Sequence, residues 1–172
     1  RVPVPPLPLE MPMKILFAAL LTAAALHASP AFADSPASSP LAGKWAIDVD
    51  KLPMPPEARP KSVTLEFHDH ADGKWTTQVN IVNPDGSTLH SDALLPLDGT
   101  PGPVTGDYWA DVSAMKMPAP NVLVLQLAYK GTPSSTRIYT VNGDGRTLTE
   151  TKAFFSKEGS PILQTTTFTR IP

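Results

Sequence analysis

The sequence contains no cysteine among its 172 residues. This absence excludes disulfides, thiolate metal ligands, a thiol nucleophile and the lipidated cysteine of a bacterial lipoprotein. Long apolar runs are also missing, because no segment reaches the roughly 20 residues that a membrane-spanning helix needs. The hydrophobic core alone must therefore stabilise the fold, and no membrane span is expected in the mature protein.

The N-terminal part has the order of a secretory signal in residues 13–33. Lys14 provides a short basic region, residues 15–26 form an apolar stretch, and an Ala-Phe-Ala cleavage site ends at Ala33. We expect cleavage after Ala33 and a periplasmic or secreted protein. Residues 1–12 are interpreted as sequence upstream of the true start.

Charge is scarce and nearly balanced once residues 1–33 are removed, with 12 basic and 15 acidic residues and a net charge of −3. Neutralising phosphates takes a concentrated basic surface, so no nucleic-acid partner is expected. The remaining length suits one domain. We assign residues 43–172 to this domain and residues 34–42, rich in Ser, Pro and Ala, to a flexible tether.

Turn residues divide the domain into short runs that are rich in β-branched, aliphatic and aromatic residues, as strands prefer. Asp72-Gly73 is one such turn. No window longer than one turn has the 3.6-residue periodicity of a helix. The nine runs are 43–49, 61–68, 73–82, 87–95, 108–117, 121–129, 135–142, 146–155 and 161–170.

Eight or nine consecutive strands with mostly short turns predict an all-β fold, an antiparallel up-and-down meander. A meander of this length either exposes two edge strands or closes, and closure removes the edges. We therefore expect a small barrel, with an open sheet or a sandwich as the alternative.

Four motifs mark turns and strand starts along the chain: Gly-Lys-Trp at 43–45, Pro-Lys-Ser at 60–62, Pro-Val-Thr-Gly at 103–106, and an Arg…Asp-Gly…Thr pattern at 137–149. This layout resembles small exported bacterial proteins of uncharacterised function with a lipocalin-like barrel. The resemblance implies the same barrel for nearly the whole mature chain.

The resemblance also implies a closure of one barrel end, in which a tryptophan following a glycine is covered by a basic residue near the C-terminus. Gly43, Trp45 and Arg170 match this pattern. An arginine over an indole ring would contribute roughly 0.5–2 kcal/mol as a cation–π pair. We expect this role to be structural.

The stretch Glu-Phe-His-Asp-His places Glu66, His68 and His70 on one face of a strand. Imidazole and carboxylate suit zinc, nickel or copper. That face is expected to look toward solvent, and His90 is the only other histidine after residue 33. We interpret the stretch as a polar hairpin end, predict no metal and no cofactor, and keep the three residues as the candidate ligands if a metal binds.

The remaining chemistry is sparse. Asp107, Asp111 and Glu150 could be acids or bases, but we interpret such carboxylates as solvated strand faces or turn caps, and the sequence has no G-x-S-x-G nucleophile motif. We expect no enzyme. Five aromatic residues would line a ligand pocket if the barrel keeps a lumen and would otherwise fill the core: Trp75, Tyr108, Trp109, Tyr129 and Tyr139.

The function expected from this pattern is a non-enzymatic binder of a small apolar ligand in the periplasm. The alternative is a structural or protein-interaction module of the cell envelope with a filled core. A cavity of roughly several hundred Å³ would favour the binder. The sequence predicts neither the ligand nor the oligomeric state.

Overall fold

The computed structural model of the protein describes residues 39–70, 72–106 and 109–172. The upstream segment, the signal peptide and residues 34–38 of the expected tether lie outside these ranges. Asp107 and Tyr108, the latter one of the five candidate pocket residues, lie outside them as well.

The described chain is all-β, an antiparallel meander in a nearly closed barrel, as the sequence predicts. Its strands are β1 (Gly43–Ile47), β2 (Ser62–His70), β3 (Lys74–Val82), β4 (Thr88–Pro96), β5 (Gly102–Pro103), β6 (Thr105–Gly106), β7 (Val112–Ala119), β8 (Val122–Tyr129), β9 (Thr132–Val141), β10 (Thr147–Phe155) and β11 (Pro161–Ile171). Each of the nine long strands overlaps one of the nine expected runs, although β7 begins four residues later and β9 three residues earlier than expected. The two-residue strands β5 and β6 raise the number of described strands to 11.

The helical content consists of η1 (Val49–Lys51) and η2 (Pro56–Ala58), which lie in the proline-rich crossing between β1 and β2. The first run ends at Ile47 rather than at residue 49, because the side chain of Asp48 accepts a hydrogen bond from the Asp50 N–H and starts η1. No helix in the described ranges is long and apolar enough to cross a membrane.

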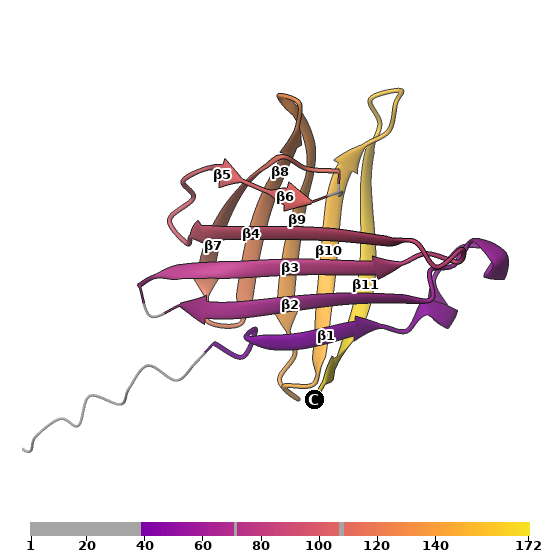
Figure 1. Ribbon diagram of the computed structural model, residues 1–172. Helices are drawn as coiled ribbons and strands as arrows, with labels where there is room; N and C mark the ends of the chain where they lie inside the picture. The colour runs from indigo at the N-terminus through magenta and orange to yellow at the C-terminus, as the bar shows by residue number, and fades with distance from the viewer. Residues whose placement is uncertain (1–38, 71, 107–108) are drawn as a thin grey trace, which may run out of the picture. The chain divides into compact units, whose positions relative to one another are not determined.

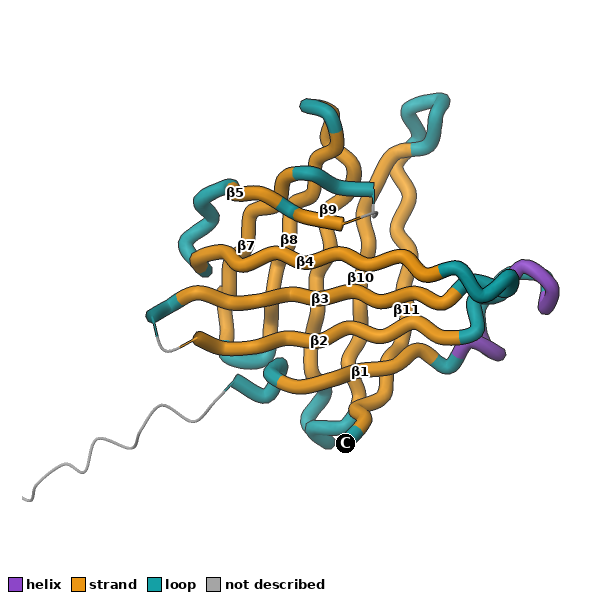
Figure 2. The backbone as a smooth tube through the Cα atoms, in the orientation of Figure 1, coloured by secondary structure: helices purple, strands orange, loops and turns teal. Residues whose placement is uncertain are grey.

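The sheet curls so that its two halves face each other. Strands β1 to β4 form one layer and β7 to β11 the other, and the strands of the two layers cross in projection (Figure 1, Figure 2). Strand β1 pairs with both β2 and β11, so the sheet continues from one layer to the other without a break in pairing.

Residues 102–106 bridge the remaining gap between β4 and β7. On one side Gly102 and Pro103 pair with β7, and on the other Thr105 and Gly106 pair with β4. The φ of Gly106 is +111°, and a Cβ there would lie 2.1 Å from the backbone oxygen of His90. Glycine is therefore required where this segment meets β4, which gives the Pro-Val-Thr-Gly motif a structural role.

One end of the barrel is closed around Trp45, which is fully buried and donates from Nε1 to the Leu41 carbonyl at 2.9 Å. The guanidinium carbon of Arg170 lies 4.1 Å from the centroid of the indole ring. Its nitrogens donate to the backbone carbonyls of Ala42 at 2.7 Å, of Gly145 at 2.9 Å, and of Pro40. The arginine thus links β11 to two other chain segments, residues 40–42 and the turn at Gly145, over the tryptophan.

Gly43 makes room for this arrangement. Its φ is +120°, and a Cβ on it would lie 2.6 Å from Nη1 of Arg170. The three residues that the resemblance singles out therefore lie together in space, in a contact that is structural in kind.

Residues 39–42 differ from the flexible tether expected for them. Leu41 has no exposed surface and belongs to the main hydrophobic cluster, and the N–H of Ala42 donates to the Ser39 carbonyl at 3.0 Å. The reason is that Leu41 completes the apolar end around Trp45. These four residues are part of the packed domain.

Candidate functional site

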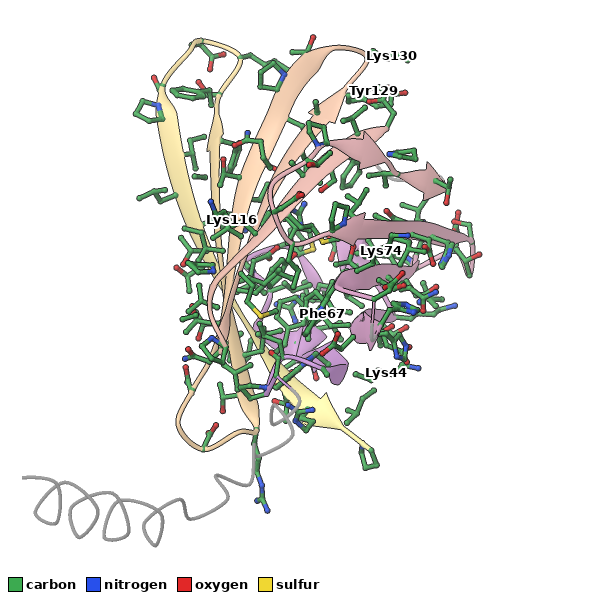
Figure 3. The ribbon with its side chains drawn as sticks, turned by 90° about the vertical axis from the view of Figure 1, so that its left-hand side faces the viewer. Lys44, Phe67, Lys74, Lys116, Tyr129 and Lys130 are labelled. Atoms are coloured by element: carbon green, nitrogen blue, oxygen red, sulfur yellow. The ribbon has the colours of Figure 1, made fainter. Side chains whose placement is uncertain are left out.

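The candidate pocket aromatics do not form one cluster. Trp75 and Tyr139 are each 2% exposed in the core, where Tyr139 meets Phe67 edge-to-face with ring centroids 5.3 Å apart. Tyr129 is exposed at the end of β8, beside Lys130 and far from Phe67, which lies between the layers (Figure 3). Of the described members, Trp109 alone lines an open cleft.

This cleft has a volume of about 370 Å³ and lies between the two layers. One side, here called the apolar wall, comes from β2, β3 and β4 and consists of Val63, Leu65, Val79, Ile81 and Leu89. The other side, here called the polar wall, comes from β9, β10 and β11 and consists of Arg137, Glu150, Lys152, Gln164 and Thr166. Trp109 and the crossing between β1 and β2 form its rim.

The alternation of side chains along β9 and β10 places the polar wall on the inner face of the barrel. Tyr139 and Val141 are buried on β9, and Arg137 has the same parity. Leu148 is buried on β10, and residues 150 and 152 have its parity. In the register, Tyr139 lies opposite Glu150 and Arg137 lies opposite Lys152, which in turn lies opposite Gln164 on β11.

Glu150 is 6% exposed and accepts two hydrogen bonds, from Nη1 of Arg137 and from the hydroxyl of Tyr139, both at 2.9 Å. The side chain of Arg137 is only 11% exposed, so this is a buried ion pair. The expectation that Glu150 belongs to a solvated strand face is corrected by this burial. Its charge is tolerated because charge-assisted hydrogen bonds replace water.

Burial raises the pKa of Tyr139 well above its usual value, and the neighbouring negative charge of Glu150 adds to this effect. The phenol therefore stays protonated and remains a hydrogen-bond donor to the carboxylate at any ordinary pH.

Lys152 is half-buried, and burial lowers its pKa from 10.5, assisted by repulsion from Arg137 and opposed by Glu150. Its ammonium lies 4.4 Å from the centroid of the Phe154 ring. Among the described residues, the charged groups that line the cleft are Arg137, Lys152 and Glu150. The cleft thus has hydrocarbon on one side and charged and polar side chains on the other.

The interior beyond the cleft is nearly filled. A second cavity there measures about 30 Å³ and is shared by Leu65, Val79, Arg137 and Tyr139 among others. The Ser113 hydroxyl also lines it, and its buried oxygen has no hydrogen-bond partner among the described residues. A space of this size holds a water molecule or two but no organic ligand.

The histidine stretch uses its side chains locally. Nε2 of His68 lies 2.9 Å from Glu66, and Nε2 of His70 lies 2.7 Å from the Thr76 hydroxyl. His90 contacts Asn80 at 2.7 Å, four positions along β3 from Thr76 and hence roughly 13 Å away from that row. Within residues 39–70, 72–106 and 109–172, no group of three or more histidine and carboxylate side chains is placed to hold a metal ion.

Comparisons with known proteins add no functional assignment. No protein-family model matches the chain, and no curated protein matches it with significant similarity. The cleft is the feature of the described structure whose size and lining suit a small molecule, since such sites are mostly apolar with a few placed polar groups. The functional argument therefore rests on its geometry.

Proposed function

We propose that the protein is a non-enzymatic binder of a small apolar ligand, exported to the periplasm. The observation that supports this proposal is the cleft of about 370 Å³ between the apolar wall and the polar wall. Its volume falls in the usual range for small-molecule sites. The resemblance of the sequence motifs to exported lipocalin-like proteins and the signal-like segment before Ala33 support the export part of the proposal.

A barrel of this size can fill its interior with side chains. The end around Trp45 is filled in this way, whereas the end near Trp109 keeps an open space bordered by hydrocarbon. An apolar ligand would gain roughly 25 cal/mol for each Å² of apolar surface that it removes from water there. Binding thus needs no rearrangement of the barrel.

The test is binding of an environment-sensitive apolar dye to the delipidated protein, with Leu89→Trp as a cleft-filling variant and Leu94→Trp as its control. Leu89 lines the cleft, whereas Leu94 lies on the opposite face of the same strand and is 50% exposed. We expect dye binding to fall at least tenfold in the first variant and to remain unchanged in the second. Equal binding by both variants would place the dye elsewhere and refute the assignment.

Native mass spectrometry of the full chain, expressed with export and purified without added ligand, tests the rest of the proposal. A mass that starts at Asp34 would support cleavage after Ala33, and a co-purified small molecule would give the chemical class of the ligand. An uncleaved chain that stays in the cytoplasm would refute the export proposal.

A protein-interaction module is the second candidate. Phe155 and Leu163 favour it, because they are 72% and 76% exposed near the tip of the β10–β11 hairpin. Exposed apolar groups of this size often mark contact surfaces. A defined oligomer or a ligand-free monomer in the same mass spectrum would favour this candidate over the binder.

A further inference from the structure

Lys152 brings a primary amine into the cleft, and among the described residues that line the cleft it is the one that does so. It has the parity of the buried Leu148 on β10, and the register places it opposite Gln164 of β11. Every other described lysine is exposed or, in the case of Lys44, lies on the face of β1 opposite the buried Trp45. The position of this amine is therefore distinctive within the barrel.

The surroundings of the Lys152 amine favour its neutral form. Glu150 accepts hydrogen bonds from Arg137 and Tyr139, and among the described residues no carboxylate lies within ion-pairing distance of Lys152. Burial is the main cause that lowers the pKa of Lys152, repulsion from Arg137 adds to it, and attraction to Glu150 opposes it. Desolvation and a neighbouring cation are the conditions that make a lysine amine nucleophilic.

The elements around this amine add no further charge in the part of the chain that the structure describes. Strand β11 contributes the neutral side chains of Gln164 and Thr166, and the apolar wall contributes hydrocarbon. On β10 itself, the Phe154 ring lies with its centroid 4.4 Å from the amine. The amine and the apolar wall border the same space of about 370 Å³, so a short apolar molecule on that wall can bring its end group to the amine.

We propose that Lys152 binds an apolar aldehyde covalently, as an imine formed inside the cleft. This inference rests on the proposed binding function and specifies its ligand class. The apolar wall would hold the hydrocarbon part of the aldehyde, which gains roughly 25 cal/mol for each Å² of apolar surface removed from water. Partial exclusion of water from the cleft would slow hydrolysis of the imine.

The chemistry needs no partner beyond the aldehyde. The ammonium first loses one proton to solvent, and the neutral Nζ then attacks the carbonyl carbon to form a C–N bond. The aldehyde oxygen takes up the two hydrogens of the amine and leaves as water, and the C=N double bond replaces the C=O bond. Nothing is oxidised or reduced, and the step is reversible.

The experiment treats the delipidated protein with decanal and sodium cyanoborohydride at pH 7. The hydride reduces each imine to a stable secondary amine, so peptide mass spectrometry identifies which lysines carry a decyl group. The proteins are the wild type, Lys152→Arg, which keeps the positive charge without the amine, and the control Lys116→Arg. Lys116 is exposed on the outer face of β7 and does not line the cleft (Figure 3).

Two further measurements accompany the labelling. Isothermal titration with decanol, which has the same chain length and cannot form an imine, measures apolar binding separately. Circular dichroism melting of each variant shows that it is folded.

We expect Lys152 in the wild type to be labelled at least tenfold faster than Lys116. The cleft holds the aldehyde beside the amine, and the neutral fraction of an amine rises about tenfold for each unit by which its pKa is lowered. Excess decanol should slow the labelling of Lys152 and leave that of Lys116 unchanged. Lys152→Arg should lose the fast label and still bind decanol, whereas Lys116→Arg should keep both.

Labelling of Lys152 that is no faster than that of Lys116, in a protein that binds decanol, would overturn the imine and leave apolar binding intact. Fast labelling that excess decanol does not slow would place the reaction outside the cleft and overturn the inference too. A fast label that persists in Lys152→Arg would overturn the assignment to this residue. Absence of both decanol binding and fast labelling would overturn the inference and the proposed function together.

Discussion

The buried pair of Arg137 and Glu150 offers a quantitative test of the polar wall. Three variants form a double-mutant cycle: Glu150→Gln, Arg137→Met and the two together. Glutamine keeps an acceptor for the Tyr139 hydroxyl and removes the charge, and methionine keeps much of the length of arginine and removes its charge. Removing one partner of a fully buried pair costs about 3–5 kcal/mol, because the other charge is left uncompensated.

The two single variants should differ in a predictable direction. Glu150→Gln leaves two cations facing each other across β9 and β10, and the open side of the cleft admits some water, so we expect a loss of about 2–4 kcal/mol. Arg137→Met leaves a carboxylate that keeps the Tyr139 hydrogen bond and has a lysine nearby, so a loss of about 1–2 kcal/mol is expected. The double variant should lie within about 1 kcal/mol of the wild type.

Equilibrium urea unfolding followed by tryptophan fluorescence measures these free energies, since Trp45 and Trp75 are buried in the core. The expected coupling is at least about 2 kcal/mol. Additive single effects, with a coupling below about 0.5 kcal/mol, would show that the pair is not an energetic unit. A loss in Arg137→Met as large as that in Glu150→Gln would refute the expectation that removing the carboxylate beside two opposed cations costs more than removing one of the cations.

Four further outcomes follow from other parts of the barrel. Arg170→Met keeps the stem but loses three carbonyl contacts and a cation–π contact, so urea unfolding should show a loss of about 2–4 kcal/mol; a loss below 1 kcal/mol would mean that water replaces these contacts. Gly106→Ala forces a backbone clash, and amide hydrogen exchange at the facing edges of β4 and β7 should accelerate; unchanged exchange would contradict closure by residues 102–106. The double change Phe155→Ser and Leu163→Ser should shift the free energy of unfolding by no more than about 0.5 kcal/mol, because both side chains are exposed; a larger loss in thermal melting would mean that they are packed in solution. Lys152→Met should be more stable than the wild type at pH 7, and the difference should narrow as pH rises toward 10.5, since the unfolded wild type then holds more protons than the folded one; a difference that stays constant with pH would contradict the lowered pKa.

The sequence is sufficient to predict the long strands, because alternation and turn chemistry act locally. Runs such as 61–68 and 73–82 correspond to β2 and β3 within two residues at each end. The segment 102–106 cannot be recognised in this way. Its strands are two residues long and contain glycine and proline, so their pairing depends on the approach of β4 and β7 rather than on any local pattern.

The candidate site was less accessible to sequence reasoning. The sequence left open whether the aromatic residues line a pocket or fill the core, because a strand pattern indicates the face on which a side chain lies and not the width of the barrel interior. In the structure Trp75 lies in the core and Tyr129 is 43% exposed. A usable signal was present in the parity of the strands. Glu150 and Lys152 have the parity of Leu148, and a charged residue on the apolar parity of a strand must be paired, satisfied or functional.

Most described side chains on the inner face of the barrel are apolar or small and uncharged, as a buried surface requires. Arg137, Glu150 and Lys152 depart from this pattern. The closed end shows that the chain can fill its interior, and buried ion pairs can often be replaced by apolar residues with no loss or a gain of about 1–4 kcal/mol. Folding therefore does not require Arg137, Glu150 and Lys152 on the inner face. In the part of the chain that the structure describes, Arg137 and Lys152 lie opposite each other where the interior is open to about 370 Å³, and charged groups at such a place are what the proposed binding function leads one to expect.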